Sequence, residues 1–574
     1  MILVFGGTTE GRKAVEVLEE GGRPYLYSTK TGEQDITLHH GHRIDGALDE
    51  EAMRAFCQEH DIRLIVDAAH PFASQLHQTI AQVSEALNIP AIRYERIYPE
   101  RDPEITWIDD YSQIPRDIHS LLATTGVQSI SKLKPLEAEG VRIYYRILQR
   151  ESSISLALKQ GVSPEQLCYY EVPQDIPVEA ETILLKESGL SGGFPEKVEA
   201  AKSRGMRIIA LKRPETLAFF TIVNGPYGLR RMVEKLLPEF YPLHSGLTTG
   251  TCATAAAVAA ALRLLKKEKP EEVPVLLPDG ETIYVPVSYS EEYASVFKDA
   301  GDDPDVTNGL EIRASVKPSE TFEILGGEGV GRFTLPGFDY PPGEAAINKA
   351  PREMIRQNLE SYGVPLQVTI SVPEGAEIAR RTFNPRLGIE GGISIIGVSG
   401  IVKPFSEEAF IESIRKCMTV AKASGSERVV INSGGKSERF VRALYPTLPQ
   451  QAFVEYGNYI GETLKIAHEL NIKKVTLGVM LGKAVKLAQG HLDTHSRKAT
   501  MDKDFIYTML REAGIETDIS DITLARELWE KIPKEKTQDF VRVVISHCET
   551  FCKPLLPEGT LTTLLIDDEG TIYS

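Results

Sequence analysis

Apolar runs alternate with amphipathic stretches over the first 105 residues. Ile2 to Phe5 form a short apolar run that predicts a buried strand, and the glycine-rich turn GGTTEG follows from Gly6 to Gly11. Residues Arg12 to Glu20 place apolar side chains at helical spacing, and a second apolar run from Pro24 to Ser28 completes a βαβ pattern. Continued alternation to about residue 105 predicts a doubly wound, nucleotide-binding-type α/β subdomain.

The pattern changes twice further along the chain. Alternation continues to Leu243 and predicts a second doubly wound subdomain over residues 106–243. A long alanine-rich helix and short strands broken by Pro and Gly then indicate an α+β domain over 244–405. Strand and helix alternation returns over 406–574 and predicts a further Rossmann-like α/β domain, whose tail from Thr537 we interpret as two strands and a closing hairpin. The predicted fold class is therefore α/β and α+β.

Composition and charge narrow the class of protein. The chain has 574 residues, too many for one hydrophobic core, and its 42% hydrophobic and 25% charged residues are typical of packed globular proteins. Its 64 basic and 81 acidic residues give a net charge of −17, which disfavours nucleic acid as a partner. No apolar stretch is long enough for a membrane segment. Oligomeric state is left open, and a homo-oligomer is compatible with the sequence.

The six cysteines are few and scattered. They predict no disulfide framework, and they fit a reducing cytoplasm. His547, Cys548 and Cys552 lie close together, but no second ligand pair follows at zinc-site spacing. We therefore predict a structural role for these three residues and no metal site.

The first glycine turn is a candidate cofactor site. Glycines between a strand and a helix let the backbone approach a pyrophosphate, although a tight turn alone would explain the same pattern. The cofactor-binding candidates in this turn are Gly6, Gly7, Thr8, Thr9 and Gly11. After the second strand, Ser28 and Lys30 replace the acidic residue that would accept a ribose 2′-hydroxyl. That difference favours NADPH, with NADH as the alternative.

A second glycine-rich segment matches the dinucleotide pattern more closely. GGEGVG runs from Gly326 to Gly331, but the residues that follow, RFTLPG, cannot start a helix. We predict a turn that lets another backbone or a ligand approach.

Three further candidate segments lie in loops that follow predicted strands or helices. His70 lies just past the strand from Leu64 to Ala68, where it is either catalytic or a helix cap. Lys186, a catalytic candidate, and Ser188, a substrate-binding candidate, precede three glycines and a helix start, a pattern suited to anion binding. His495, with Asp493 two residues before it, is either a general base or a hydrogen-bonded loop histidine.

The C-terminal domain carries its own nucleotide-type loops. They follow two predicted strands, Arg428 to Asn432 and Lys474 to Val479, whose carboxyl ends would lie side by side. The cofactor-binding candidates there are Ser433, Gly434, Gly435, Gly478 and Gly482.

Arginine clusters could bind an anion within this acidic protein. The candidates are Arg93, Arg96 and Arg386, and solvated surface arginines are the alternative explanation.

These motifs together resemble two enzyme families. GGTTEGR at the start, DAAHPFA from Asp67, RYER from Arg93 and KESGLSGGFPEK from Lys186 resemble the precorrin-6A reductase family. From about residue 244 the chain resembles the cobalt-precorrin-5B C1-methyltransferase family, through GLTTGTCATAAA, KDAGDDPDVT, GGEGVGRFTLPG, GEAAINKAPREMI, NPRLGIEGGISIIG and GKAVKLAQGHLDTHS.

The resemblance implies a bifunctional enzyme of cobalamin biosynthesis. Residues 244–574 would use S-adenosylmethionine to methylate C1 of cobalt-precorrin-5B, and residues 1–243 would use a nicotinamide to reduce the product, cobalt-precorrin-6A, to cobalt-precorrin-6B. The partners would be cobalt-containing tetrapyrroles, contacted by Arg93, Arg96, Ser188, Thr248, Thr249 and Arg386. Two alternatives are a regulatory N-terminal half beside an active methyltransferase, and a non-catalytic macrocycle carrier.

Overall fold

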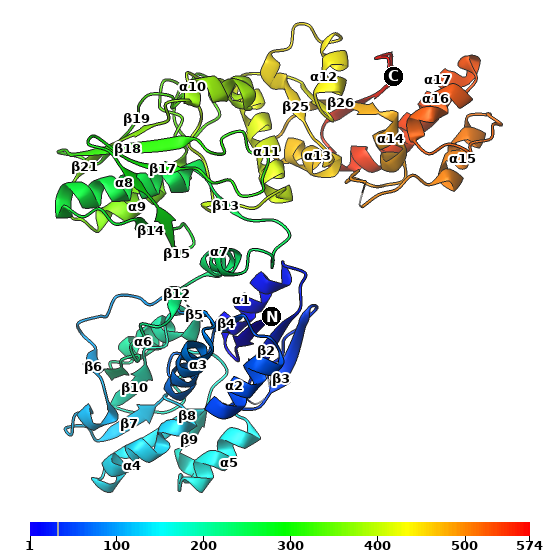
Figure 1. Cartoon of the computed structure of the whole chain (residues 1–574). Helices are drawn as coiled ribbons and strands as arrows, with labels where there is room; N and C mark the ends of the chain where they lie inside the picture. Colours follow the sequence, from blue (N-terminus) through cyan, green and yellow to red (C-terminus); the bar gives the residue numbers. More distant parts are fainter. Residues whose placement is uncertain (31–33, 497) are drawn as a thin grey trace. The chain divides into compact units, whose positions relative to one another are not determined.

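The computed structural model describes residues 1–30, 34–496 and 498–574. Its internal contacts divide the chain into two units (Figure 1). The first unit contains Met1–Ser245 together with Pro274–Tyr284, and the second contains Gly246–Val273 and Val285–Ser574. The functional division at residues 243 and 244 stays a prediction. Among the described residues, no helix is both long and apolar enough to cross a membrane.

The first sheet of unit 1 is parallel and doubly wound. Its strands lie in the order β12-β5-β4-β1-β2-β3, with bounds β1 Ile2–Phe5, β2 Tyr25–Thr29, β3 Gly41–Asp45, β4 Leu64–Asp67, β5 Ala91–Tyr94 and β12 Thr221–Val223. Helices α1 (Thr9–Glu19) and α7 (Pro226–Leu236) pack on one face, and α2 (Glu50–Glu59) and α3 (Ser74–Leu87) pack on the other. The predicted α/β class is confirmed here.

Two elements of this sheet come from late in the sequence. β12 pairs with β5, and α7 packs against α1, although both lie within the predicted second subdomain, 106–243. The chain thus returns to the first sheet after it completes the second. Apolar positions of α7 explain the return, because Leu229 and Val233 are fully buried in the core of the first sheet.

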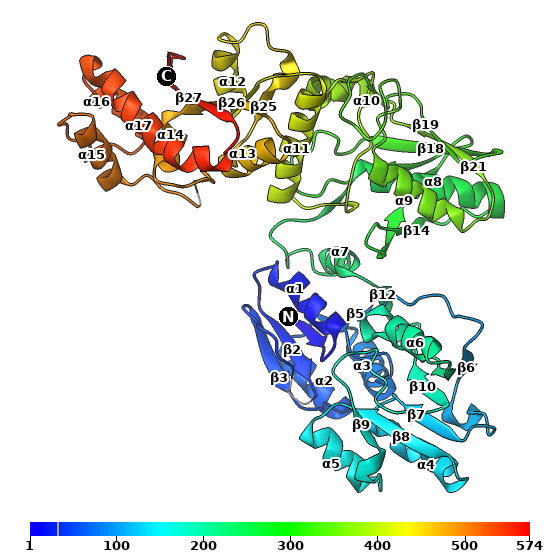
Figure 2. The ribbon, with the colours of Figure 1, turned by 180° about the vertical axis from the view of Figure 1, so that it is seen from behind.

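The second sheet of unit 1 is also parallel (Figure 2). Its order is β6-β11-β10-β7-β8-β9, with bounds β6 Thr106–Ile108, β7 Ser120–Ala123, β8 Arg142–Ile147, β9 Leu167–Tyr169, β10 Thr182–Lys186 and β11 Arg207–Leu211. Helices α4 (Ile130–Ala138) and α5 (Glu151–Lys159) cover one face, and α6 (Phe194–Ser203) covers the other. Both sheets therefore have strand-order reversals, at β1/β4 and at β7/β10, where such folds place ligands.

A hairpin from later in the chain completes unit 1. It is built from β14 (Glu272–Leu276) and β15 (Thr282–Pro286), and residues 274–284 belong to this unit by their contacts. Glu281 is 1% exposed, and its carboxylate accepts hydrogen bonds from the backbone amides of Tyr227, at 3.1 Å, and Gly228. The side chain thus caps the N-terminus of α7. Burial raises the pKa of Glu281 to about 7.

The first part of unit 2 is α+β, as predicted. Its main sheet has the order β16-β17-β18-β21-β19, with bounds β16 Ser288–Tyr289, β17 Ala294–Phe297, β18 Glu311–Pro318, β19 Glu323–Gly326 and β21 Leu366–Ser371. Helix α8 (Thr249–Lys266) contacts β17, β18 and α9 (Lys349–Glu360), and its residues 249–262 are buried. Small alanine side chains allow this close packing on several sides.

The GGEGVG segment forms a turn that is followed by the short strand β20 (Arg332–Phe333) and not by a helix, as predicted. A Cβ added at Gly329 would stand 1.7 Å from the Val372 carbonyl oxygen, and one added at Gly331 would stand 2.7 Å from the Gly392 carbonyl oxygen. The glycines therefore permit other backbone segments to approach closely.

The second part of unit 2 is a Rossmann-like sheet in the order β25-β24-β26-β27-β28. Its bounds are β24 Val429–Asn432, β25 Phe453–Glu455, β26 Lys474–Met480, β27 Thr560–Ile566 and β28 Ile572–Tyr573, with only β28 antiparallel. Helix α12 (Gly435–Arg442) packs on one face. The other face is covered by α11 (Glu407–Ala423), α13 (Ile460–Glu469), α14 (Leu481–Ala488) and α17 (Thr537–Cys552).

The C-terminal tail differs from its prediction. Residues 537–552 form helix α17 and not the first of two strands, whereas the hairpin between β27 and β28 is present. The β-branched run in this segment favoured a strand, but the apolar side chains at helical spacing decide the structure. Phe540, Val544 and Cys548 lie on one face of the helix and are buried against the sheet.

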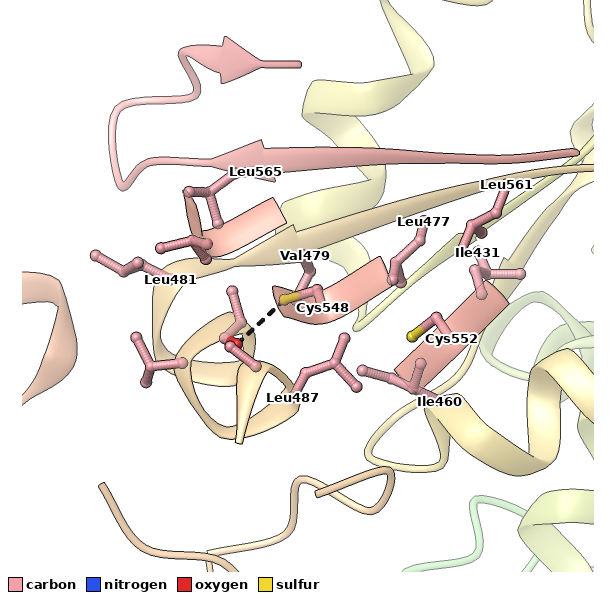
Figure 3. Packing of buried hydrophobic residues seen from close by; sticks show 14 of the residues in the cluster. Ile431, Ile460, Leu477, Val479, Leu481, Leu487, Cys548, Cys552, Leu561 and Leu565 are labelled. Atoms are coloured by element: carbon pink, nitrogen blue, oxygen red, sulfur yellow. Dashed lines mark hydrogen bonds between the residues drawn. The ribbon is translucent and has the colours of Figure 1, made fainter. Parts of the chain in front are cut away.

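Cys548 and Cys552 lie in this apolar core (Figure 3). Their neighbours include Ile460, Val479 and Leu487, and the Cys548 thiol donates a hydrogen bond to the Ala484 carbonyl at 3.3 Å. Burial raises the pKa of Cys552 to about 12 and that of Cys548 as well. Among the described residues, no group of three His, Cys, Asp or Glu side chains could hold a metal ion.

Candidate functional site

The first candidate site lies at the strand-order reversal between β1 and β4, where folds of this class form a ligand-binding crevice. The GGTTEG turn connects β1 to α1, and Thr8 fixes its geometry from the N-cap position. Thr8 Oγ1 accepts a hydrogen bond from the Gly11 amide at 3.0 Å and donates one to the Ala68 carbonyl at 2.6 Å. These bonds join the ends of β1 and β4, and the amide of Thr9 begins the helix beside them.

Tyr27 explains two of the predicted glycines. A Cβ at Gly6 would stand 2.1 Å from the Tyr27 hydroxyl oxygen, and one at Gly11 would stand 2.7 Å from it. Gly7 has a φ of +87°, its added Cβ would face open space, and its amide donates to Tyr27 and to Gln34. Gly6 and Gly11 therefore make room for Tyr27, and Gly7 alone faces outward. Sequence reasoning missed Tyr27 and Gln34, since neither belongs to the glycine pattern.

The end of β2 carries the residues predicted to select the nicotinamide cofactor. Ser28 is buried in the strand, and its carbonyl accepts from the Gly6 amide at 3.0 Å. Lys30 is exposed just beyond the strand. The two residues thus flank the glycine turn at the carboxyl edge of the sheet, and the 2′-phosphate contact stays a prediction.

His70 follows β4 in a turn built around a buried acid. Asp67 Oδ1 accepts from the Ala69 amide at 3.1 Å and from Arg93 at 2.9 Å, and Oδ2 lies 2.6 Å from His77 Nδ1. His70 Nδ1 accepts from the Phe72 amide at 3.2 Å, so the ring proton resides on Nε2. Burial, followed by the charge of Arg96, lowers the pKa of His70 to about 3. The histidine is therefore a neutral hydrogen-bond donor.

Lys186 lies on the facing side of the same turn. It ends β10, and its Nζ stands 5.0 Å from the centroid of the Phe72 ring, which in turn lies 5.9 Å from the His70 ring. Burial lowers the pKa of Lys186 to about 8. Lys197, on α6, donates to the Gly192 carbonyl at 2.8 Å, and burial also lowers its pKa to about 8. Neither lysine has an acidic partner within the described residues.

The predicted substrate arginines of unit 1 are instead engaged by the protein. Arg93 pairs with Asp67 at 2.9 Å, and Arg96 pairs with Glu10 at 2.9 Å. Arg96 also donates to the Ser188 carbonyl at 2.7 Å, which joins the loops that follow β5 and β10. Both guanidinium groups are almost fully buried, so they hold the crevice in shape and do not present free charge to a ligand.

The candidate site of the second unit lies at its own strand-order reversal, between β24 and β26, where folds of this class form a ligand-binding crevice. The two strands are parallel neighbours, so the loops that follow them lie at one edge. A Cβ at Gly435 or at Gly482 would meet no atom within 4 Å, which leaves both loops facing open space. Ser433 is held by Ser437, whose hydroxyl accepts from the Ser433 amide at 3.1 Å.

Two other glycines of this crevice face protein atoms. A Cβ at Gly478, inside β26, would stand 2.8 Å from Val441, so packing explains this residue. A Cβ at Gly434 would stand 3.4 Å from Glu455 Oε1. Glu455 and the neighbouring Lys483 were missed from the sequence. The position of an acid after the second strand was the available signal.

The loop with His495 lies beside the same crevice. Its Thr494 amide donates to the Asn458 carbonyl at 3.0 Å, in the loop after β25. Asp493 accepts from the His495 backbone amide at 3.0 Å and pairs with Lys498 at 2.9 Å. Burial alone would raise the pKa of Asp493, but its contacts with Lys498 and the His495 amide lower that pKa below its ordinary value. Asp493 therefore orders the loop through the His495 backbone.

Thr248, Thr249 and Arg386 make contacts within unit 2. Thr248 caps α8 by accepting from the Thr251 amide at 3.2 Å, and Thr249 Oγ1 accepts from the Ile396 amide at 2.8 Å. Arg386 pairs with Glu438 of α12 at 2.7 Å. The threonines thus hold the loop that contains Ile396, and Arg386 bonds to the first turn of α12.

Comparisons with known proteins match two different families to two parts of the chain. Residues 1–226 match the family model of precorrin-6x reductase CbiJ/CobK, and residues 238–404 match that of CbiD. Cobalt-precorrin-5B C(1)-methyltransferase of Prosthecochloris aestuarii is 44% identical over 345 residues, which cover 56% of this chain and 94% of that protein. The enzyme of the same name from a Geobacillus species is 42% identical, covering 53% and 88%.

Two solved structures are also similar to parts of the chain. The cobalamin biosynthesis protein CbiD of Archaeoglobus fulgidus shares 32% identity, covering 48% of this chain and 85% of that one, with a TM-score of 0.26. A CobK precorrin-6A reductase shares 18% identity, covering 41% and 96%, with a TM-score of 0.33.

Proposed function

Because the chain belongs to the cobalt-precorrin-5B C(1)-methyltransferase family and begins with a precorrin-6x reductase match, we propose that it catalyses two consecutive steps of cobalamin biosynthesis. The second unit methylates C1 of cobalt-precorrin-5B, and the first reduces the resulting cobalt-precorrin-6A to cobalt-precorrin-6B. The observation that carries this proposal is the presence of two family matches together with a separate strand-switch crevice in each unit.

The methyltransferase crevice fits an adenosine cofactor. S-adenosylmethionine, when bound, supplies the methyl group. Gly435 and Gly482 leave open space at the ends of β24 and β26, so backbone amides can approach a ligand there. His495 contributes either a base or a contact to substrate carboxylates, and Asp493 positions it through the backbone amide. Methyl transfer needs in-line placement more than a protein nucleophile, which suits this set of residues.

The reductase crevice fits a nicotinamide cofactor, which supplies hydride when bound. Gly7 leaves open space at the end of β1, and the first amides of α1, including that of Thr9, favour an anion beside it. We assign Lys30 to the 2′-phosphate of NADPH, with NADH as the alternative. His70 donates a hydrogen bond from Nε2, and Lys186 supplies a proton to the reduced macrocycle.

The substrates are macrocycles fringed with carboxylates. Lys186 and Lys197 carry positive charge without an acidic partner in the described structure, and they lie near the Ser188 loop. We therefore assign a substrate carboxylate of the reductase step to Lys197, and Ser188, whose hydroxyl donates to the Gly192 carbonyl at 3.1 Å, orders the loop beside it. The proposed location is the cytoplasm, a reducing compartment that suits a chain with few and scattered cysteines.

The test uses the purified full-length chain. Incubation with cobalt-precorrin-5B and S-adenosylmethionine should add the mass of one methyl group, and later addition of NADPH should add two hydrogens. Methylation without any reduction would support a regulatory first unit instead. Binding of the macrocycle without either mass change would support a carrier.

A further inference from the structure

The second unit carries an unpaired carboxylate beside its glycine loop. Glu455 ends β25, and its side chain is only partly exposed. Within the described residues it accepts no hydrogen bond and forms no ion pair. Its Oε1 lies 3.4 Å from the position that a Cβ at Gly434 would occupy. The carboxylate therefore lies against the loop that leads from β24 into α12.

The charged side chains around Glu455 are engaged elsewhere. Arg386 pairs with Glu438 at 2.7 Å, and Glu438 also pairs with Arg442 at 2.6 Å. Lys483 donates to the Gly457 carbonyl. Burial raises the pKa of Glu455, against the lowering influence of Arg386 and Lys483. A partly buried acceptor without donors costs free energy, which a ligand hydroxyl would recover.

The order of elements matches a nucleoside site. A glycine loop follows β24, α12 and β25 come next, and Glu455 stands 20 residues after Gly435. In dinucleotide-binding folds, an acid about 20 residues beyond the glycines accepts from ribose hydroxyls. The first turn of α12 has no side-chain cap, so its amides are also available to a ligand.

We propose that Glu455 accepts hydrogen bonds from the vicinal ribose hydroxyls of S-adenosylmethionine. This inference rests on the proposed methyltransferase function, which assigns that cofactor to the crevice between β24 and β26. Glu455 is then a binding residue that selects ligands with an intact ribose diol, and it takes no part in the transfer of the methyl group.

Calorimetric titration of the full-length chain tests the inference. The probes are S-adenosylhomocysteine and its 2′-deoxy counterpart, each titrated into wild type, Glu455→Gln and Glu427→Gln. Glu427 is a matched control, because it is exposed and, in the described part of the chain, forms a surface ion pair with Lys474 at 3.2 Å. Wild type and the control should prefer the ribose ligand by about 10- to 100-fold, since a hydrogen bond to a charged group contributes that much affinity. Glu455→Gln should lose most of this preference.

The unfolding temperature of each variant separates binding from folding. Glu455→Gln should unfold at or above the wild-type temperature, because it removes a partly buried charge. If it unfolds lower, Glu455→Asp retains the charge but withdraws the carboxylate, and it should show the same loss of preference. A Glu455→Gln protein that still prefers the ribose ligand overturns the inference and leaves the proposed function intact. Wild type that binds neither ligand overturns both.

Discussion

Gly435 and Gly478 lie near one crevice, yet valine should have opposite effects at the two positions. At Gly435, the first residue of α12, an added Cβ meets no atom within 4 Å, and the backbone does not require glycine. Removing glycine from a helix is favourable by up to about 1 kcal/mol, so Gly435→Val should leave the free energy of unfolding within about 1 kcal/mol of wild type. The new side chain instead fills space that the ligand needs.

At Gly478 the same substitution acts on the core. The added Cβ would stand 2.8 Å from Val441 Cγ2, between β26 and α12. Overpacking of this kind costs about 1–3 kcal/mol of stability. Gly478→Val should therefore lower the unfolding temperature, whereas Gly435→Val should not.

Three measurements check this pair of variants. Calorimetry gives the stability of each, and titration with S-adenosylmethionine should show at least about 100-fold weaker binding to Gly435→Val, equivalent to about 2.7 kcal/mol. Reduction of supplied cobalt-precorrin-6A by Gly435→Val should stay near the wild-type rate. Unchanged methylation would refute the glycine-loop assignment. Loss of both activities in a folded protein would mean that the two units share one composite site.

Three other predictions concern the first unit. Lys30→Ala should weaken NADPH more than NADH in binding titrations, and an equal effect on both would remove the 2′-phosphate assignment. The rate of reduction should fall as pH rises through about 8, where Lys186 loses its proton. Lys186→Gln should lower the rate by about 10²–10⁴ and should abolish this fall with pH. Lys197→Gln should still show the fall. The pKa of Glu281 is higher in the folded than in the unfolded state, so the folded state favours the protonated side chain. Up to about 3 kcal/mol of the free energy of unfolding should therefore be lost as pH rises from 4.5 through about 7. Chemical denaturation at pH 5 and pH 8 should show a smaller pH difference for Glu281→Gln, and an unchanged difference would contradict the argument.

Local sequence patterns predicted the parallel sheets well. The GGTTEG turn and the loop at Ser433 each follow a short apolar run, and both were placed correctly between a strand and a helix. The prediction for the C-terminal tail was wrong for a physical reason. Residues 537–552 contain β-branched side chains that favour a strand, but burial of one helical face outweighs that local preference.

The site residues divide along the same line. Positions at the carboxyl ends of strands, such as His70 after β4 and Lys186 at the end of β10, could be found because each lies at the ligand-binding edge of its own parallel sheet. Partners supplied by distant elements could not. No pattern near Gly6 in the sequence predicts its contact with the ring of Tyr27, and no pattern near Arg96 predicts Glu10 as its ion-pair partner.

The hairpin with Glu281 limits where the chain can be cut into two independent proteins. A reductase truncated at residue 243 would lack residues 274–284, and the N-terminus of α7 would lose the carboxylate that caps it. The first unit is therefore discontinuous in sequence, because residues 274–284 lie within the stretch that matches the CbiD family model. An engineered protein in which one half is replaced by a homologue must keep residues 274–284 with the first unit, or supply another acceptor for the Tyr227 and Gly228 amides.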